Sequence, residues 1–216
     1  CCVTVFSQSP TTHLLSSRTG YPLGSPGANS CAAADIDGDL KTDLLAASAD
    51  GSLYFLQQQA GGFAAPVAYQ LDSGYTAGAV AVGDINDTYA GSEVLVSCAN
   101  SVNQGFQLFY RLGGGLARGA LTIFSADQPN QPPMALGADD VDGDGLSEVV
   151  IGLNALGRTN LTVVNRTGGM TRTAFFGAAR ELLTSDLDGD GRKDVAAACP
   201  LRNSLAMLHQ NSTGSL

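Results

Sequence analysis

The stretch MALGADDVDGDGLSEVVIG, residues 134–152, decides the fold because its pattern recurs along the chain. It places a loop of alternating acidic residues between two short apolar runs. The same arrangement returns as CAAADIDGDLKTDLLAAS at 31–48, as AVAVGDINDTYAGSEVLVS at 79–97 and as ELLTSDLDGDGRKDVAAAC at 181–199. Self-similarity at a spacing of roughly 50 residues indicates a repeat architecture.

Each repeat continues into further short apolar runs that are typical of β-strands. Beyond the two runs that flank the acidic loop, a third run lies at residues 52–57, 106–111, 161–165 and 204–209, and a fourth lies at 64–71, 120–124 and 171–176. Glycine-rich turns such as Gly113–Gly115 separate the runs. Four short antiparallel strands per repeat are typical of a propeller blade. We therefore predict an all-β fold, a β-propeller-like array of about four four-stranded antiparallel blades with Asp-rich calcium loops.

The composition agrees with short strands joined by turns. Charged residues make up only 14% of the chain, glycines number 27, and there are too few Lys and Glu residues for long amphipathic helices. The runs beside the acidic loops are apolar at nearly every position, which is typical of strands covered on both faces. The repeats are predicted at about 31–78, 79–133, 134–180 and 181–216.

Residues 1–30 precede the first complete repeat and are predicted to supply strands to a neighbouring or terminal blade. Val3–Phe6 resembles the third strand of a repeat, and His13–Leu15 occupies the place of a fourth. The last repeat ends after its third run, so the two ends together offer five strands where a blade needs four. Three arrangements remain open: a compact four-unit propeller, a piece of a larger ring, or an open array in which one molecule completes its neighbour.

The acidic loops carry the chemistry. The motif Asp-x-Asp-Gly-Asp-x-x-x-Asp/Glu is intact three times, and carboxylates at alternate positions can surround one hard cation together with the backbone carbonyl of the seventh residue. Gly38, Gly143 and Gly189 permit the sharp turn inside each loop. Oxygen ligands alone favour calcium over magnesium and predict about three ions. The predicted ligands are Asp35, Asp37, Asp39, Lys41, Asp43, Asp140, Asp142, Asp144, Leu146, Glu148, Asp186, Asp188, Asp190, Arg192 and Asp194, with Lys41, Leu146 and Arg192 acting through their carbonyls.

The second loop, which begins at Asp84, has lost this pattern. It carries one extra residue, lacks the middle acids and contains the glycosylation sequon of Asn86. We predict no calcium there, or a weak site. None of the loops has the glutamate at position twelve that an EF-hand requires, and all lie between strands, so that alternative is excluded.

These repeats resemble the FG-GAP or VCBS-type repeat of the β-propellers found in integrin α-subunits, fungal lectins, polysaccharide lyases and bacterial surface proteins. The resemblance covers residues 31–216 and is carried by AAADIDGDLKTDLLAA, GADDVDGDGLSEVVIG and TSDLDGDGRKDVAAA. It implies propeller blades with calcium in the loop between the first two strands. Rings of this family usually have seven blades, whereas this chain has four repeats.

The charge of the chain follows from the acidic loops. Twelve of the 20 acidic residues lie in the three intact loops, and the remaining acids are fewer than the 11 basic residues. The net charge of −9 is therefore interpreted as metal ligands. The absence of a basic stripe with interleaved aromatics excludes nucleic-acid binding, and no apolar run reaches the length of a membrane span.

Two further features favour an extracellular, secreted or cell-surface location. The chain has five cysteines, an odd number that permits disulfides but leaves at least one unpaired, and their connectivity stays open. It also has four N-glycosylation sequons, at Asn86, Asn160, Asn165 and Asn211.

No catalytic constellation is evident. The only histidines are His13 and His209, both in outer runs, and neither a nucleophile elbow nor a phosphate-binding loop occurs. We expect a non-catalytic protein of adhesion or structural assembly, self-assembling into an extracellular filament or coat, whose partners are its own copies or extracellular proteins and glycans. One alternative is a lectin module, although the chain has no Trp and only Tyr54 and Tyr110 occupy matching positions. Another is a fragment of a polysaccharide lyase or other propeller enzyme.

Overall fold

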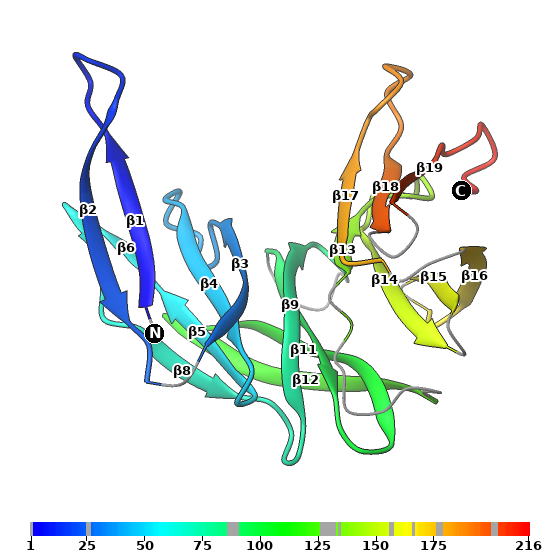
Figure 1. The fold of residues 1–216 in the computed structure, drawn as a ribbon, viewed down its shortest axis with the longest axis horizontal. Coiled ribbons are helices and arrows are strands. Elements are labelled where there is room, and N and C mark those ends of the chain that lie inside the picture. The colour runs from blue at the N-terminus through cyan, green and yellow to red at the C-terminus, as the bar shows by residue number, and fades with distance from the viewer. Residues whose placement is uncertain are drawn as a thin grey trace.

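The computed structural model describes residues 2–24, 27–85, 91–125, 133, 135–155, 158–165, 167–175, 179–199 and 203–216. Within these ranges the protein is all-β, and four antiparallel sheets follow one another along an arc (Figure 1). The sheets are the blades of a β-propeller, which confirms the predicted fold class.

The four blades each correspond to one sequence repeat. Blade 1 consists of β3 (Ala28–Ala34), β4 (Asp43–Ser48), β5 (Ser52–Leu56) and β8 (Val67–Gln70), and blade 2 of β9 (Thr76–Gly83), β10 (Glu93–Ala99), β11 (Asn103–Leu112) and β12 (Gly115–Ser125). Blade 3 consists of β13 (Leu136–Asp139), β14 (Glu148–Ala155), β15 (Arg158–Val164) and β16 (Met170–Phe175). Blade 4 consists of the three strands β17 (Glu181–Ser185), β18 (Asp194–Cys199) and β19 (Ser204–Leu208). Strands pair in chain order within each blade. In every blade the acidic segment joins the first strand to the second.

One strand starts later than its sequence pattern predicts. The fourth strand of blade 1 was expected from residue 64, but β8 begins at Val67. The preceding residues form a separate small hairpin, β6 (Gln58–Gln59) and β7 (Gly62–Phe63), which extends beyond the blade.

Neighbouring blades pack through both faces of their sheets. The first strands β3, β9, β13 and β17 lie side by side in that order. Leu45 and Phe55 of blade 1 pack with Val80 and Val94 of blade 2, and the same layering repeats between blades 2 and 3 and between blades 3 and 4. These strands are thus covered on both faces, which explains why their sequences are apolar at nearly every residue.

The N-terminal segment forms a two-stranded antiparallel hairpin, β1 (Cys2–Gln8) and β2 (Leu15–Pro22). Val3 and Tyr21 pack against Tyr54 and Leu56 of blade 1, so the hairpin covers that face of the blade as a neighbouring blade would. The prediction of a strand at 13–15 is mostly wrong. Residues 9–14 form a tight turn, closed by the N–H of His13 on the carbonyl of Ser9.

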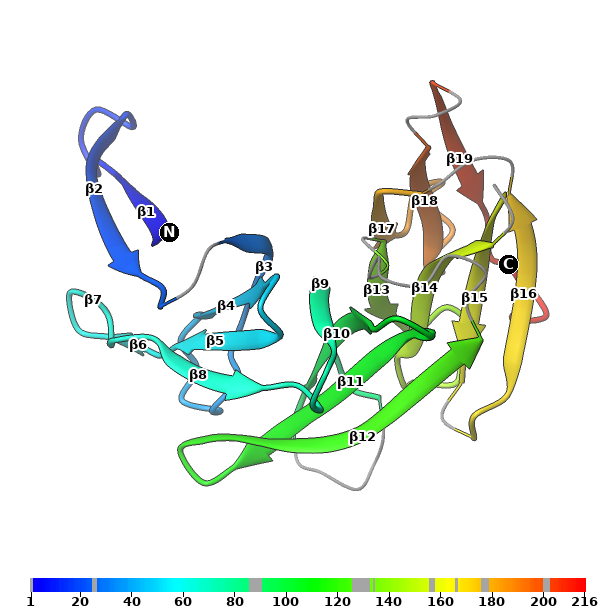
Figure 2. The same cartoon turned by 60° about the horizontal axis from the view of Figure 1, so that its bottom comes forward.

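The hairpin and blade 4 lie at opposite ends of the arc in both ribbon views (Figures 1 and 2). In the part of the chain that the structure describes, β1 and β2 pair only with each other. The four blades of residues 28–208 therefore follow an arc whose two ends do not meet. No helix among the described residues is long and apolar enough to cross a membrane.

Candidate metal centres in the blade loops

The acidic segments are named here by their blades: loop 1 (35–43), loop 2 (84–93), loop 3 (140–148) and loop 4 (186–194). Loops 1, 3 and 4 are wound in the same way. In loop 3 the first carboxylate, Asp140, accepts backbone N–H bonds from Gly143 at 2.6 Å and from Gly145 at 3.0 Å. The equivalent bonds run from Gly38 and Leu40 to Asp35, and from Gly189 and Gly191 to Asp186. Each loop thus curls around its first acid.

The backbone conformation of the loops explains their glycines. Gly38, Gly143 and Gly189 have positive φ angles of 74°, 83° and 85°, which confirms the predicted sharp turn. A second left-handed position follows two residues later, where loops 3 and 4 have glycine and loop 1 has Leu40, with φ 65° and a side chain 94% exposed. Leu40 holds a conformation that a branched side chain rarely adopts.

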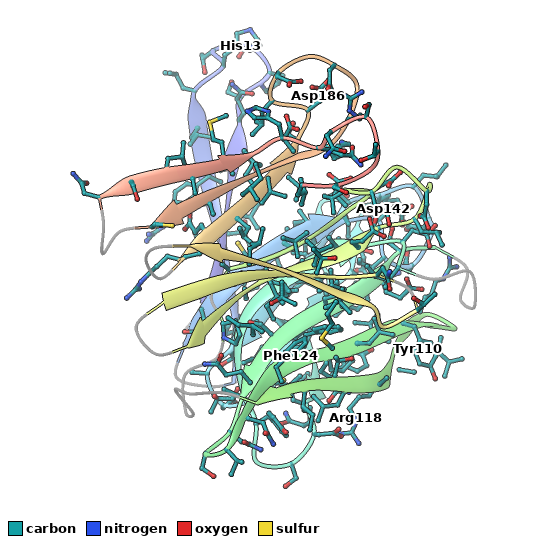
Figure 3. All side chains as sticks on the ribbon, turned by 90° about the vertical axis from the view of Figure 1, so that its right-hand side faces the viewer. His13, Tyr110, Arg118, Phe124, Asp142 and Asp186 are labelled. Atoms are coloured by element: carbon teal, nitrogen blue, oxygen red, sulfur yellow. The ribbon has the colours of Figure 1, made fainter. Side chains whose placement is uncertain are left out.

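The winding gathers carboxylate oxygens at each loop. One oxygen from each member of a group lies within 4.8 Å of the others in three groups: Asp35, Asp37 and Asp39; Asp140, Asp142 and Glu148; and Asp186, Asp188 and Asp190. Calcium–oxygen distances of about 2.4 Å place opposite ligands about 4.8 Å apart, so one ion fits within each group. In Figure 3, Asp142 and Asp186 lie in loops beyond the ends of the strands.

Loop 3 provides the strictest test of whether the residues fit a cation. Glu148 is 1% exposed, and its Oε2 accepts the backbone N–H groups of Val141 and Asp142. Its Oε1 is buried without any hydrogen-bond partner. Burial, reinforced by the charge of Asp142, raises the pKa of Glu148 to about 7. A buried, unpartnered carboxylate oxygen beside two further carboxylates is the donor set that a hard divalent cation stabilises.

The ninth residue of loops 1 and 4 has a second role that the sequence pattern did not reveal. Asp43 is fully buried, and its two oxygens accept the N–H of Ile36, within the loop, and the N–H of Gln58, at the end of the third strand. Asp194 repeats this with Leu187 and Gln210. We call this arrangement the clamp, because one carboxylate holds the loop to the third strand.

Asp194 is held ionised by its clamp. Burial opposes its ionisation, but the N–H bonds from Gln210 and Leu187 and the contact with His209 outweigh burial and lower its pKa. His209, which the sequence indicated as a surface residue, lies with Nδ1 3.2 Å from Asp194 and 3.4 Å from Asp188. The position of His209 in the sequence could have indicated this contact. His209 directly follows the third strand and precedes Gln210, whose N–H bonds to Asp194 in the clamp.

Basic side chains also contact the loops. Lys41 Nζ lies 2.5 Å from Asp39 Oδ2, and Arg192 pairs in the same way with Asp190. The hydrogen bond with Lys41 lowers the pKa of Asp39, and the same bond raises the pKa of Lys41. Both pairs are exposed to solvent, where such ion pairs contribute little stability.

The seventh residues were predicted to act through their carbonyls. The structure shows their N–H groups, which donate to the fifth-position acids: Lys41 to Asp39, Leu146 to Asp144 and Arg192 to Asp190. Ligation by these three carbonyls stays a prediction.

Loop 2 keeps the bond from its second residue to its last acid although its acidic pattern is lost. Glu93 is fully buried and accepts the N–H of Ile85 at 2.7 Å through Oε2. The carbonyl of Asp84 accepts the N–H of Ser147 in loop 3. Residues 86–90, including the Asn86 sequon, lie outside the described residues, so the absence of calcium from loop 2 stays a prediction.

The cysteines and the other sequons were assigned to an extracellular chain. The four described cysteines, Cys2, Cys31, Cys98 and Cys199, are all free, and Cys1 lies outside the described residues. Burial raises the pKa of the Cys98 thiol to about 12. Among the sequons, Asn165 and Asn211 are exposed, while Asn160 lies in β15 and its side chain is outside the described set.

Comparisons with known proteins support the repeat and the fold. Residues 35–87 match the sequence family of the FG-GAP-like repeat. No curated protein matches the chain in sequence. Among solved structures, the BBS1N chain, crystallised in complex with ARL6DN and soaked with lead, superposes with a TM-score of 0.56 at 13% identity, over 88% of this chain and 58% of that chain.

A second solved structure, the rhamnogalacturonan lyase YesW, superposes with a TM-score of 0.52 at 17% identity, over 88% of this chain and 39% of that chain. The chain thus spans well under two thirds of the length of either structure, and at these identities the likeness concerns the fold alone. The fold, the repeated loops and the family match together identify the chain as a β-propeller protein that carries an FG-GAP-like repeat at residues 35–87.

Proposed function

We propose that this protein is a non-catalytic, calcium-stabilised propeller scaffold that works outside the cell in adhesion or structural assembly. Calcium held in loops 1, 3 and 4 fixes the turns between the first two strands of three blades. The ions neutralise carboxylates that would otherwise repel one another.

The observation that carries the proposal is the buried Oε1 of Glu148 in loop 3. An ionised carboxylate oxygen without a hydrogen bond is costly in a folded protein. A calcium ion between Glu148, Asp142 and Asp140 removes that cost, because it supplies the positive charge that no described side chain places on Oε1. The oxygen-only donor set of loops 1 and 3 favours calcium over softer metals.

The chain's own residues prepare each site. The N–H bonds to the first acid hold the loop curled, and the clamp fixes the loop to the third strand. The three acids that converge in loop 4, Asp186, Asp188 and Asp190, are all exposed, whereas the converging groups of loops 1 and 3 each contain a buried acid. We therefore assign the weakest affinity to loop 4. Calcium sites of low affinity, with dissociation constants of about 0.1–1 mM, serve in extracellular modules, which supports the proposed location.

The scaffold role is favoured over a sugar-binding role by the tyrosines. Tyr54 is only 6% exposed and packs against the N-terminal hairpin, so its ring is not available to stack on a sugar. A lectin function would then need a different kind of site.

Thermal unfolding with and without calcium tests the proposal. The melting temperature is measured in calcium, in magnesium and in excess EGTA on the same preparation. We expect a rise in calcium that magnesium does not reproduce, because magnesium prefers fewer carboxylates and more waters. Identical melting in calcium and EGTA would contradict the proposal.

A further inference from the structure

The register of the blades shows which face of each sheet meets the next blade. The residue two positions after the last acid of the loop is Leu45 in blade 1, Leu95 in blade 2 and Val150 in blade 3, and all three are completely buried. Each lies in the cluster shared with the following blade. The equivalent residue of blade 4 is Ala196, so the face that carries Ala196 is the one that would meet a further neighbour.

That face of blade 4 exposes large apolar side chains. Leu183 and Met207 flank Ala196 on the neighbouring strands, and Leu205 follows on the next row. Their side chains are 58%, 50% and 64% exposed. The residues equivalent to Leu205 in blades 1, 2 and 3, which are Leu53, Phe106 and Leu161, are at most 6% exposed because the next blade covers them. We call the face with Leu183, Ala196, Leu205 and Met207 the tail face.

The tail face differs from its counterparts on the innermost strand. Where blade 4 has Leu183, blades 1, 2 and 3 have Ala32, Ala81 and Gly137, whose small side chains let the next first strand approach closely. Glu181 adds a charge on the same strand, opposite Ala198. A partner that brings its own first strand to this position would clash with Leu183. The fitting partner is a sheet without an inner strand.

The N-terminal hairpin is such a sheet. It covers blade 1 as a neighbouring blade would, but it contains only the two strands β1 and β2. Its other face carries Phe6, which is 56% exposed, with Arg18 directly opposite. We call this the head face. The guanidinium of Arg18 and the carboxylate of Glu181 give the head and tail faces opposite charges beside their apolar centres.

We propose that the tail face of one molecule binds the head face of a second copy of this chain. Phe6 contacts Leu205 and Met207, and Arg18 pairs with Glu181. An open hollow of about 470 Å³ lies at the edge of the tail face and leaves room for an aromatic ring; its lining includes Arg180 as well as Glu181, Ala198 and Leu205. The contact forms between molecules, because the hairpin and blade 4 of one molecule lie at opposite ends of the arc (Figure 2).

A contact between two different faces has a consequence for assembly. Each bound copy leaves one free head and one free tail, so growth continues into an open chain or closes only when the rotation allows it. This inference rests on the assembly role proposed above and names its partner and its surface.

Complementary blocking tests the contact. Phe6→Asp destroys the head and keeps the tail, while the double variant Leu183→Asp with Met207→Asp destroys the tail and keeps the head. We expect wild type to form concentration-dependent oligomers in calcium, each variant to be a monomer, and a mixture of the two to stop at a one-to-one dimer. The readout is molar mass by light scattering after size-exclusion chromatography.

Matched controls separate this contact from general stickiness and from misfolding. Val102→Asp changes an exposed apolar residue, 65% accessible, that lies on neither face, and it should leave the oligomers intact. Arg18→Glu and Glu181→Arg should each weaken assembly, and the two combined in one chain should restore it. Circular dichroism and melting in calcium confirm that each variant is folded.

Several outcomes would overturn the proposal. These are a wild type that stays monomeric at high concentration, variants that assemble unchanged, or a mixture that does not dimerise. A monomeric wild type that still melts higher in calcium would refute the contact and leave the calcium-stabilised scaffold standing. Oligomers that form normally in a protein whose melting does not respond to calcium would refute the calcium-stabilised scaffold and leave the contact standing.

Discussion

Loops 2 and 3 occupy equivalent places in adjacent blades, yet they share only part of their structure. Both hold a buried glutamate whose Oε2 accepts a backbone N–H from the second residue of the loop, Glu93 from Ile85 and Glu148 from Val141. In loop 3 alternating aspartates converge with the glutamate, a pattern that the sequence of loop 2 lacks. The comparison separates two roles within one motif. In both loops the last acid holds the second residue of the loop, and in loop 3 the acids before it complete the candidate cation site.

The largest expected difference between the loops is in their response to calcium. Asp142→Asn should remove the calcium-dependent stabilisation from loop 3, because the amide keeps the turn bond to Asp144 but lacks the charge. At calcium about 100-fold above the dissociation constant, one lost site lowers the free energy of unfolding by about 3 kcal/mol. Urea unfolding in calcium and in EGTA measures the difference.

The matched control is in loop 2. Asp84→Asn changes the first acid of a loop that is predicted to bind no calcium, or only weakly. It should leave the difference between calcium and EGTA at the wild-type value. An equal loss in both variants would mean that loop 2 also binds calcium and that the two loops are not distinct.

The bond from the second residue to the last acid should matter in both loops and should not depend on calcium. Glu93→Ala leaves the N–H of Ile85 without its acceptor in a partly buried position, which lowers the free energy of unfolding by about 2 kcal/mol. Glu93→Gln retains an acceptor oxygen and should cost less. Chemical unfolding in EGTA compares the two variants, and a stable Glu93→Ala protein would show that the bond to Ile85 is dispensable.

The pH dependence of the calcium-free protein distinguishes the two glutamates further. The pKa of Glu148 is raised from 4.5 to about 7 in the folded state, so the folded protein binds a proton more tightly than the unfolded chain. Its stabilising contribution is complete below about pH 4.5 and is lost as the pH rises to about 7. In EGTA, Glu148→Gln should abolish a decline of about 2–3 kcal/mol across this window.

Unfolding curves at a series of pH values in EGTA give that decline directly. If the wild type and Glu148→Gln fall in parallel between pH 4.5 and 7, then the proton on Glu148 does not contribute and the buried carboxyl is stabilised in another way.

The smallest expected effect comes from the second left-handed position. Leu40→Gly should stabilise the protein by about 0.5–1 kcal/mol, because relief of the unfavourable φ slightly exceeds the added freedom of the unfolded chain. The reciprocal change Gly145→Ala in loop 3 meets no neighbouring atom, so its cost reports the backbone conformation alone. Melting temperatures of both variants in EGTA should therefore shift in opposite directions, and shifts of the same sign would refute this explanation.

The sequence predicted the blades because each repeat carries its own strand pattern. A single short apolar run can be a strand or part of a helix, but the same run at the same place in four repeats indicates a strand. It predicted the loops because a metal motif is local: the acids that converge lie within nine residues. The clamp bonds of Asp43 to Gln58 and of Asp194 to Gln210 could not be predicted, since they depend on the register of a third strand. The same holds for His209, whose contacts arise only when that strand returns to the loop.

The ends of the chain were harder to predict for a related reason. The N-terminal strands were recognised, but their position on blade 1 depends on packing between Tyr21, Tyr54 and Phe63, which are far apart in sequence. The exposed tail face appeared only when the three buried counterparts of Ala196 were aligned in space.

The central claim is that the acidic loops hold calcium, and counting the ions tests it most directly. Protein passed through a gel-filtration column in buffered calcium is analysed for metal and protein in the same fractions. The account predicts about three calcium ions per wild-type chain, and one fewer after Asp142→Asn. A chain that retains no calcium, or a count that Asp142→Asn leaves unchanged, would contradict it.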